Sequence, residues 1–226
     1  MKALVTGAAR GIGAAVAGQL RAGGMDVVTL DRLAGCDLQL DLRTDEVPEM
    51  ADIDVCVSNA AVTTTIAPAH RMTDEQWDLD VEVNLRGAYR VVRACLGGMR
   101  ERGYGRIVVV SSGAARSGLP GQVAYSASKA GLGGMIRTIA AEVASLGITA
   151  NAVLPGMVAT EMVLAMPEEI RERLLAALPA RRFVSPEEVA AVVAFLASPA
   201  AGSVTGEEVG VDGGMHLSTM SLTSRG

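Results

Sequence analysis

Residues 6–13 read Thr6-Gly7-Ala8-Ala9-Arg10-Gly11-Ile12-Gly13, and this stretch decides the fold. The apolar run before it, residues 2–6, is too short for a helix and is typical of a buried parallel strand. The Ala-rich run at residues 11–22 has apolar residues at helical spacing, and residues 27–31 form the next strand. The pattern predicts a strand–helix–strand unit opened by a glycine-rich turn.

The three glycines of this turn have separate expected roles. Gly7 makes the tight turn, Gly11 lets the backbone approach a phosphate, and Gly13 lets the helix pack closely on the strand. The start of the following helix presents free N–H groups and partial positive charge to a pyrophosphate. A glycine turn alone could be an ordinary loop, but the flanking strand and helix favour a dinucleotide site.

Asp31 closes the second predicted strand. A carboxylate there can accept both hydroxyls of an adenosine ribose, and it repels a 2′-phosphate. Arg10 and Arg32 could instead pair with such a phosphate. Because Asp31 has the more decisive position, we expect NAD as the cofactor, with NADP as the less favoured alternative. Asp31 could also be a simple turn residue at the end of a strand.

Length and composition limit the function classes. With 226 residues, half of them hydrophobic, the chain is expected to form one α/β domain over residues 1–226. The net charge of −5 and the 3% aromatic content argue against nucleic-acid binding. No apolar run is long enough to span a membrane, and residues 1–20 do not read as a signal peptide. Three widely spaced cysteines indicate a reduced, cytoplasmic protein, and two histidines make a metal site implausible.

Strand and helix patterns alternate along the chain. This alternation predicts a single-domain, Rossmann-type, doubly wound parallel sheet of about seven strands. Only residues 32–35 separate the second and third strands, so the helix expected there is missing or truncated. The expected strands are residues 2–6, 27–31, 36–40, 54–58, 106–111, 148–154 and 207–211; the expected helices are 11–22, 74–102 (two helices meeting near Asn84), 125–145, 162–177 and 186–197.

A second group of polar residues lies in the middle of the chain. Ser112 follows a β-branched strand, and the carboxyl ends of parallel strands face the ligand crevice. Tyr125 and Lys129 share one helix face. The ammonium of Lys129, together with the positive nicotinamide, should lower the pKa of Tyr125, which could then exchange a proton, while Ser112 binds a carbonyl oxygen. Taken alone, the pair could be a half-buried aromatic beside a solvated lysine, and Ser112 a strand-end cap.

In this order the motifs resemble those of the short-chain dehydrogenase/reductase family, over nearly the whole chain. The resemblance implies that Asn84, within Val83-Asn84-Leu85-Arg86-Gly87, is a further catalytic residue. It would kink its helix and help to hold a proton-relay water near Lys129, although an isolated asparagine could simply satisfy buried backbone groups. The implied catalytic residues are Asn84, Ser112, Tyr125 and Lys129.

The resemblance also implies a set of cofactor contacts. Asp41 and Leu42 match the pair that flanks the adenine, and residues 151–160 match the segment that holds the nicotinamide carboxamide through the Val158 backbone and the Thr160 hydroxyl. The expected cofactor-binding residues are Gly7, Arg10, Gly11, Ile12, Gly13, Asp31, Arg32, Asp41, Leu42, Asn59, Ala60, Ala61, Tyr125, Lys129, Pro155, Gly156, Val158 and Thr160.

The chain departs from the family pattern in two places. Residues 58–61 read Ser58-Asn59-Ala60-Ala61 where the family usually has Asn-Asn-Ala-Gly, so we expect a modest effect on stability. The missing helix after Asp31 should leave the adenosine side of the cofactor site more open than usual.

The substrate and the assembly are less constrained. Residues 157–184 are expected to form a lid, and the predicted substrate contacts are Ala114, Met157 and Met162, which suit a hydrophobic ketone or alcohol. These apolar residues could equally pack an amphipathic lid helix. In similar family members two helices form a dimer face, and dimers pair into tetramers. The apolar surplus in residues 84–102 and 125–145 therefore predicts a homotetramer; it comprises Val91, Val92, Ala94, Leu96, Leu132, Met135, Ile136 and Ile139.

The predicted function is hydride transfer between NAD(H) and a secondary alcohol or ketone, as in a short-chain alcohol dehydrogenase or ketoreductase. One alternative is an NADPH-dependent 3-oxoacyl-acyl-carrier-protein reductase, which the C-terminal half also resembles. An enoyl reductase is less favoured, since those relatives typically space the tyrosine and lysine further apart. A more remote alternative is a non-catalytic protein that binds a nicotinamide cofactor.

Overall fold

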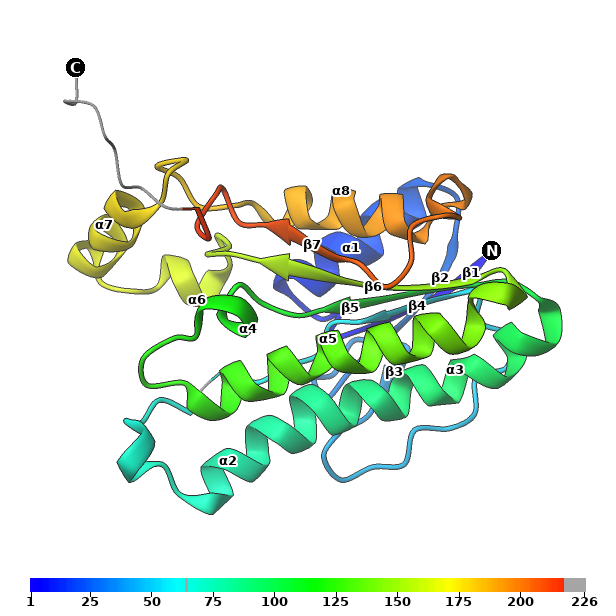
Figure 1. Ribbon diagram of the computed structural model, residues 1–226, viewed down its shortest axis with the longest axis horizontal. Coiled ribbons are helices and arrows are strands. Elements are labelled where there is room, and N and C mark those ends of the chain that lie inside the picture. Colours follow the sequence, from blue (N-terminus) through cyan, green and yellow to red (C-terminus); the bar gives the residue numbers. More distant parts are fainter. Residues whose placement is uncertain (64, 218–226) are drawn as a thin grey trace.

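The computed structural model describes residues 1–63 and 65–217. Within them, parallel strands form one sheet in the order β3-β2-β1-β4-β5-β6-β7 (Figure 1). The strand order reverses beside β1, which creates a crevice at the carboxyl ends of β1 and β4. The predicted doubly wound parallel sheet is confirmed. The strands are β1 (Lys2–Thr6), β2 (Asp26–Asp31), β3 (Leu38–Gln39), β4 (Val55–Ser58), β5 (Gly105–Val110), β6 (Ile148–Pro155) and β7 (Glu208–Val211).

Helices cover both faces of the sheet. On one face lie α1 (Gly11–Ala22) and α8 (Pro186–Ala197), and on the other lie α3 (Ala88–Arg102) and α5 (Val123–Val143) (Figure 1). Ser185 is the N-cap of α8 and forms a capping box with Glu188. Each helix layer buries its own apolar cluster against the sheet. The described fold is therefore a three-layer α/β sandwich with two cores.

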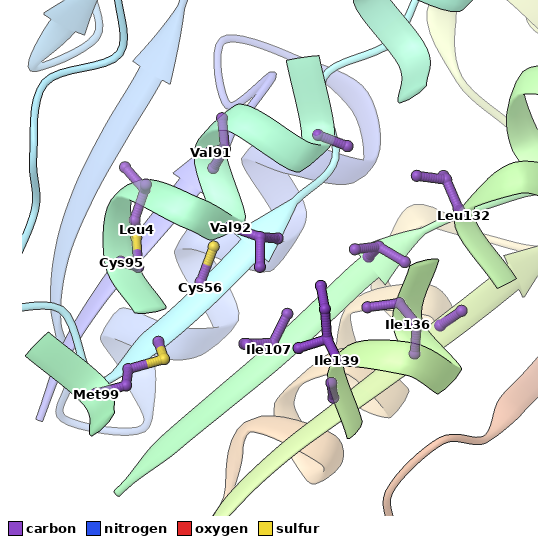
Figure 2. Close-up of a cluster of buried hydrophobic side chains, with 14 of the residues drawn as sticks. Leu4, Cys56, Val91, Val92, Cys95, Met99, Ile107, Leu132, Ile136 and Ile139 are labelled. Atoms are coloured by element: carbon purple, nitrogen blue, oxygen red, sulfur yellow. The ribbon is translucent and has the colours of Figure 1, made fainter. Parts of the chain in front are cut away.

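The cluster under α3 and α5 absorbs most of the apolar residues that suggested a dimer face. Figure 2 shows these side chains meeting strand residues such as Leu4, Cys56 and Ile107. These side chains are buried in the core of a single chain. They therefore do not form the exposed apolar surface from which the sequence analysis predicted subunit association. The residues concerned are Val91, Val92, Leu132, Ile136 and Ile139.

Two predicted elements are shorter than expected. The third strand is only Leu38–Gln39, because the Asp37 carboxylate takes the place of a strand partner and accepts hydrogen bonds from the Thr29 N–H (2.8 Å) and hydroxyl (2.7 Å). The helix predicted over 162–177 is two helices, α6 (Glu161–Leu164) and α7 (Glu168–Ala177). Pro167 separates them, since proline lacks an N–H and disfavours helical backbone in the preceding residue.

Other connections match the sequence or add to it. No helix follows β2 in the described residues 32–37, as predicted. The predicted break near Asn84 is a π-helical turn, Glu82–Gly87, that joins α2 (Asp74–Val81) to α3 without a loop. A four-residue helix, α4 (Ala114–Ser117), is too short to leave a periodic pattern and was not predicted. Within residues 1–63 and 65–217, none of the helices has the length and hydropathy that a membrane span requires.

Candidate active site

A cleft of about 380 Å³ lies at the carboxyl ends of β1, β2 and β4. Most of the predicted cofactor residues line it. Those in the lining are Gly7, Arg10, Gly11, Ile12, Asp31, Arg32, Asp41, Leu42, Asn59, Ala60, Ala61 and Thr160, together with the predicted substrate residue Met162.

The glycine turn has the properties of an anion cradle. Gly7 and Gly11 have positive φ angles of 66° and 57°, and a Cβ on Gly13 would lie 2.0 Å from the Gly7 carbonyl oxygen. Arg10, at the N-cap of α1, makes no side-chain capping hydrogen bond, and the first turn contains no acidic residue. The first N–H groups of α1 therefore keep their capacity for a phosphate, which fits the dinucleotide that the sequence predicts.

Thr6 and Asn59 fasten this turn to β4. The Thr6 hydroxyl accepts hydrogen bonds from the N–H groups of Asn59 and Ala60, both at 3.0 Å. The Asn59 amide donates to the carbonyl oxygens of Thr6 (3.0 Å) and Gly7 (3.1 Å). Asn59 thus shapes the turn through its side chain, and the role of the Thr6 hydroxyl was not predicted.

The adenosine end of the cleft is open and charged. The Asp31 carboxylate accepts hydrogen bonds from the N–H groups of Ala9 (3.1 Å) and Leu33 (3.0 Å), which orient it at the cleft rim. Arg10 and Arg32 are exposed in the same lining. The site therefore offers an acceptor for ribose hydroxyls and donors for a 2′-phosphate side by side.

The catalytic candidates gather where β5 and α5 meet. Lys129 is 3% exposed; its Nζ donates a 2.8 Å hydrogen bond to the Val110 carbonyl and lies 5.8 Å from the centroid of the Tyr125 ring. Ser111, in turn, donates to the Lys129 carbonyl at 2.9 Å. Tyr125 and Ser112 interact through their hydroxyls. The structure thus brings Ser112, Tyr125 and Lys129 together.

Burial dominates the proton affinities of this group. It lowers the pKa of Lys129 to about 8, because a buried ammonium loses its hydration. Burial also raises the pKa of Tyr125 above its ordinary value, and the hydrogen bond with Ser112 only partly opposes this. The predicted lowering of the Tyr125 pKa depends on Lys129 together with the positively charged nicotinamide, and it stays a prediction.

Asn84 joins the catalytic group to the cleft. Its Oδ1 accepts from the Val62 N–H (2.8 Å), and its Nδ2 donates to the Val62 carbonyl (3.0 Å) and the Ser128 hydroxyl (3.3 Å). Val62 lines the cleft. The side chain lies in the π-helical turn, where the extra backbone residue brings it toward α5.

Some predicted residues do not line the cleft. Gly156 packs closely, since a Cβ there would come within 2.8 Å of the Asp212 backbone. Met162 is 56% exposed at the rim, whereas Ala114 is buried. The predicted residues outside the cleft lining are Gly13, Asn84, Ser112, Ala114, Tyr125, Lys129, Pro155, Gly156, Met157 and Val158.

The cleft also contains residues that sequence reasoning did not assign to it. Most are apolar, and they come from β2, the loops after β2 and β3, α2, the π-helical turn and α6. They are Leu30, Leu33, Leu40, Arg43, Leu79, Val83 and Glu161. Among the described residues, no three His, Cys, Asp or Glu side chains gather as a metal site would require.

Comparisons with known proteins agree with this geometry. A family model described as enoyl-(acyl carrier protein) reductase matches residues 41–216. The acetoacetyl-CoA reductase of Rhizobium meliloti is 39% identical, with 95% of this chain and 98% of that protein covered. The 3-oxoacyl-(acyl-carrier-protein) reductase of Vibrio cholerae is 38% identical, with 95% and 97% covered.

Solved structures give the same result. A putative 2-deoxy-D-gluconate 3-dehydrogenase from Agrobacterium tumefaciens, with bound NADP, superposes with a TM-score of 0.89 at 30% identity and covers 95% of this chain and 96% of its own. The TT0495 protein of Thermus thermophilus gives 0.87 at 33% identity, with 95% and 98% covered. The motifs, the sheet order and these relatives lead to one conclusion: the chain is an oxidoreductase that belongs to the short-chain dehydrogenase/reductase family.

Proposed function

We propose that this protein transfers a hydride between a nicotinamide cofactor and a secondary alcohol or ketone. The observation that carries the proposal is the grouping of Ser112, Tyr125 and Lys129 where β5 and α5 meet, in a chain whose glycine turn leaves the start of α1 uncapped. When bound, the nicotinamide would accept or supply the hydride. A non-catalytic cofactor-binding protein would need none of the three polar side chains in this arrangement.

The side chains have complementary roles in this chemistry. The hydroxyls of Ser112 and Tyr125 would both donate hydrogen bonds to a ketone oxygen, which stabilises the negative charge that develops there. Tyr125 would then give its proton to that oxygen. The Lys129 ammonium would stabilise the tyrosinate that remains. Asn84 would hold the Val62 segment and the start of α5 in register.

The proton affinity of Tyr125 suits the role of a proton donor. Because burial raises its pKa, the hydroxyl stays protonated at neutral pH and can act as an acid toward a ketone oxygen.

For the cofactor we propose a preference for NAD(H), on the position of the Asp31 carboxylate at the rim. NADP(H) is the competing choice, supported by Arg10 and Arg32 and by the NADP bound in the Agrobacterium structure. The two differ in one group, the 2′-phosphate, which Asp31 repels and the arginines attract.

For the substrate we propose a hydrophobic ketone that enters past the exposed side chain of Met162 at the rim of the cleft. A 3-oxoacyl thioester is the second candidate, and the names of the two reductases above favour it. An enoyl substrate, suggested by the description of the family model, is less favoured because Tyr125 and Lys129 are spaced for contact on one helix face.

The proposal also covers the domain organisation, the assembly and the location of the protein. We propose one catalytic domain with a lid near residues 157–184, a homotetramer, and a cytoplasmic location that suits the free cysteines. Light scattering after size-exclusion chromatography at micromolar concentration tests the assembly, and a monomeric mass contradicts it.

The decisive experiment is a turnover panel followed by nicotinamide absorbance. Hydrophobic ketones, acetoacetyl-CoA and crotonyl-CoA are each offered with NADH and NADPH. Turnover of a ketone with NADH in preference to NADPH is expected. Turnover of crotonyl-CoA alone would replace ketone reduction with enoyl reduction, and turnover with NADPH alone would overturn the cofactor preference.

A further inference from the structure

Asp80 is a buried carboxylate beside the catalytic group that the proposed chemistry leaves without a role. It lies near the end of α2 and is 0% exposed. Its Oδ2 accepts a hydrogen bond from the Thr65 hydroxyl. Within the described part of the chain its Oδ1 has no hydrogen-bond partner. A buried, unpaired carboxylate oxygen is costly, so such a group is retained when it faces a compensating charge or donor.

The position of Asp80 relates it to α5. It lies one helical turn before Asn84, so the two side chains share a face. That face meets α5, because α2 packs against α5 (Figure 1) and Asn84 reaches the Ser128 hydroxyl. Lys129 is the next residue along α5. Both Asp80 and Lys129 are buried, and the ammonium also reaches the Val110 carbonyl of β5.

The two charges act on one another. Burial raises the pKa of Asp80, while Thr65 and Lys129 oppose that rise. Asp80 likewise opposes the lowering of the Lys129 pKa by burial, and it raises the pKa of Tyr125. Lys129 and Tyr125 are thus the titratable groups of α5 that face this carboxylate, Thr65 is its partner from the loop after β4, and Asn84 is its neutral neighbour in the π-helical turn.

We propose that Asp80 is a positioning residue for Lys129: its buried carboxylate, fixed on one side by Thr65, supplies the negative charge that keeps the ammonium protonated beside Tyr125. A buried ammonium without a counter-charge would release its proton near neutral pH and could no longer stabilise a tyrosinate. The inference rests on the proposed function, because that is where the charge of Lys129 is used.

Thr65 gives Asp80 a second, purely structural connection. The same loop is held at Ala67, whose N–H donates to the Gly121 carbonyl at 2.9 Å, and it carries Val62, which Asn84 binds. Loss of the Asp80 side chain could disturb this loop without any electrostatic effect. Asp80→Asn separates the two roles, because its amide oxygen can still accept from Thr65 while the charge is removed.

The test measures Lys129 directly and needs no turnover. The chain has two lysines, Lys2 and Lys129, so carbon-13 labelling of lysine gives two side-chain signals, which a Lys2→Arg variant assigns. The Lys129 titration midpoint is expected to fall by about one pH unit in Asp80→Asn, with that of Lys2 unchanged. Asp78→Asn removes an exposed carboxylate from the same helix and should leave both midpoints unchanged. An unchanged Lys129 midpoint in folded Asp80→Asn overturns the inference.

A measurement on the unaltered protein covers the case in which Asp80→Asn fails to fold. The Lys129 signal should show a second, smaller inflection in the acid range as Asp80 takes up a proton, and a flat curve there contradicts the inference. Failure of the proposed function looks different: no substrate would turn over, although the Lys129 signal would still respond to Asp80. If a substrate is found, the alkaline limb of the kcat profile should move in Asp80→Asn by the same amount as the midpoint, and Asp80→Glu should move it back.

Discussion

The two ends of the cleft are built in opposite ways. At the catalytic end, Asn84, Lys129 and Asp80 are buried, and their polar atoms are tied to several different segments. At the adenosine end, Asp31 and Arg32 lie at an open rim beside a strand of two residues, with no covering helix in the described residues 32–37. Substitutions at the buried end should disturb several hydrogen bonds, whereas substitutions at the open end can change the ligand preference with little loss of stability.

The largest effect is expected at Tyr125, at the catalytic end of the cleft. Tyr125→Phe removes the proton donor but keeps the ring, so kcat should fall by about 10³-fold while the cofactor Kd stays unchanged. Steady-state kinetics and fluorescence titration with the reduced cofactor measure the two quantities. Retained turnover would show that the buried end does not perform the chemistry.

A Gly13 variant tests how closely the start of α1 packs against the glycine turn. A Cβ there would lie 2.0 Å from the Gly7 carbonyl oxygen, so Gly13→Ala should lower the free energy of unfolding by about 3 kcal/mol and weaken cofactor binding. Urea unfolding measures the first effect. Gly18→Ala in the same helix is the control, because nothing lies within 4 Å of its Cβ, and it should raise stability by about 0.5 kcal/mol. Equal effects of the two variants would contradict close packing at the turn.

A Lys129 variant tests whether burial of the ammonium lowers the free energy of unfolding. Its pKa of about 8 lies below its ordinary value of 10.5, so the native state resists protonation that the unfolded chain accepts. Lys129→Met and its parent are compared in the Asp80→Asn background, because removing Lys129 alone would leave the buried Asp80 carboxylate without its counter-charge. There Lys129→Met should raise the free energy of unfolding by about 2 kcal/mol at pH 7, after the lost hydrogen bond to Val110 is counted. As the pH rises to 10.5 the lysine-containing parent loses its penalty, so the difference should shrink. Urea unfolding at several pH values checks this, and a difference that does not change with pH would contradict it.

The smallest effect is expected at the open end. Asp31→Ala should raise the KM for NADH about tenfold, through lost ribose hydrogen bonds, and leave the KM for NADPH unchanged or lower. Asp26→Ala, at the exposed far end of the same strand, should change neither value. An unchanged KM for NADH in Asp31→Ala would mean that the rim does not select the cofactor.

Features that depend on one stretch of sequence could be predicted, whereas contacts between separate segments could not. The glycine turn, the parallel sheet and the Tyr125–Lys129 pair were predictable because each depends on spacing within one element or one strand–helix unit. The break at Pro167 also had a local signal, which the apolar pattern on both sides concealed. The buried pairing of Asp80 with Thr65 had none, because it joins a helix to a loop that is distant in the sequence.

The family, the parallel sheet and the groups that gather at the strand ends could be predicted, since short-range patterns specify elements and elements of this kind assemble in one way. The burial of particular charges, the direction of the Tyr125 pKa shift and the attachment of Asn84 to Val62 depend instead on tertiary packing. The physical reason is that desolvation and buried hydrogen bonds sum over neighbours from many segments, and no stretch of sequence contains that sum.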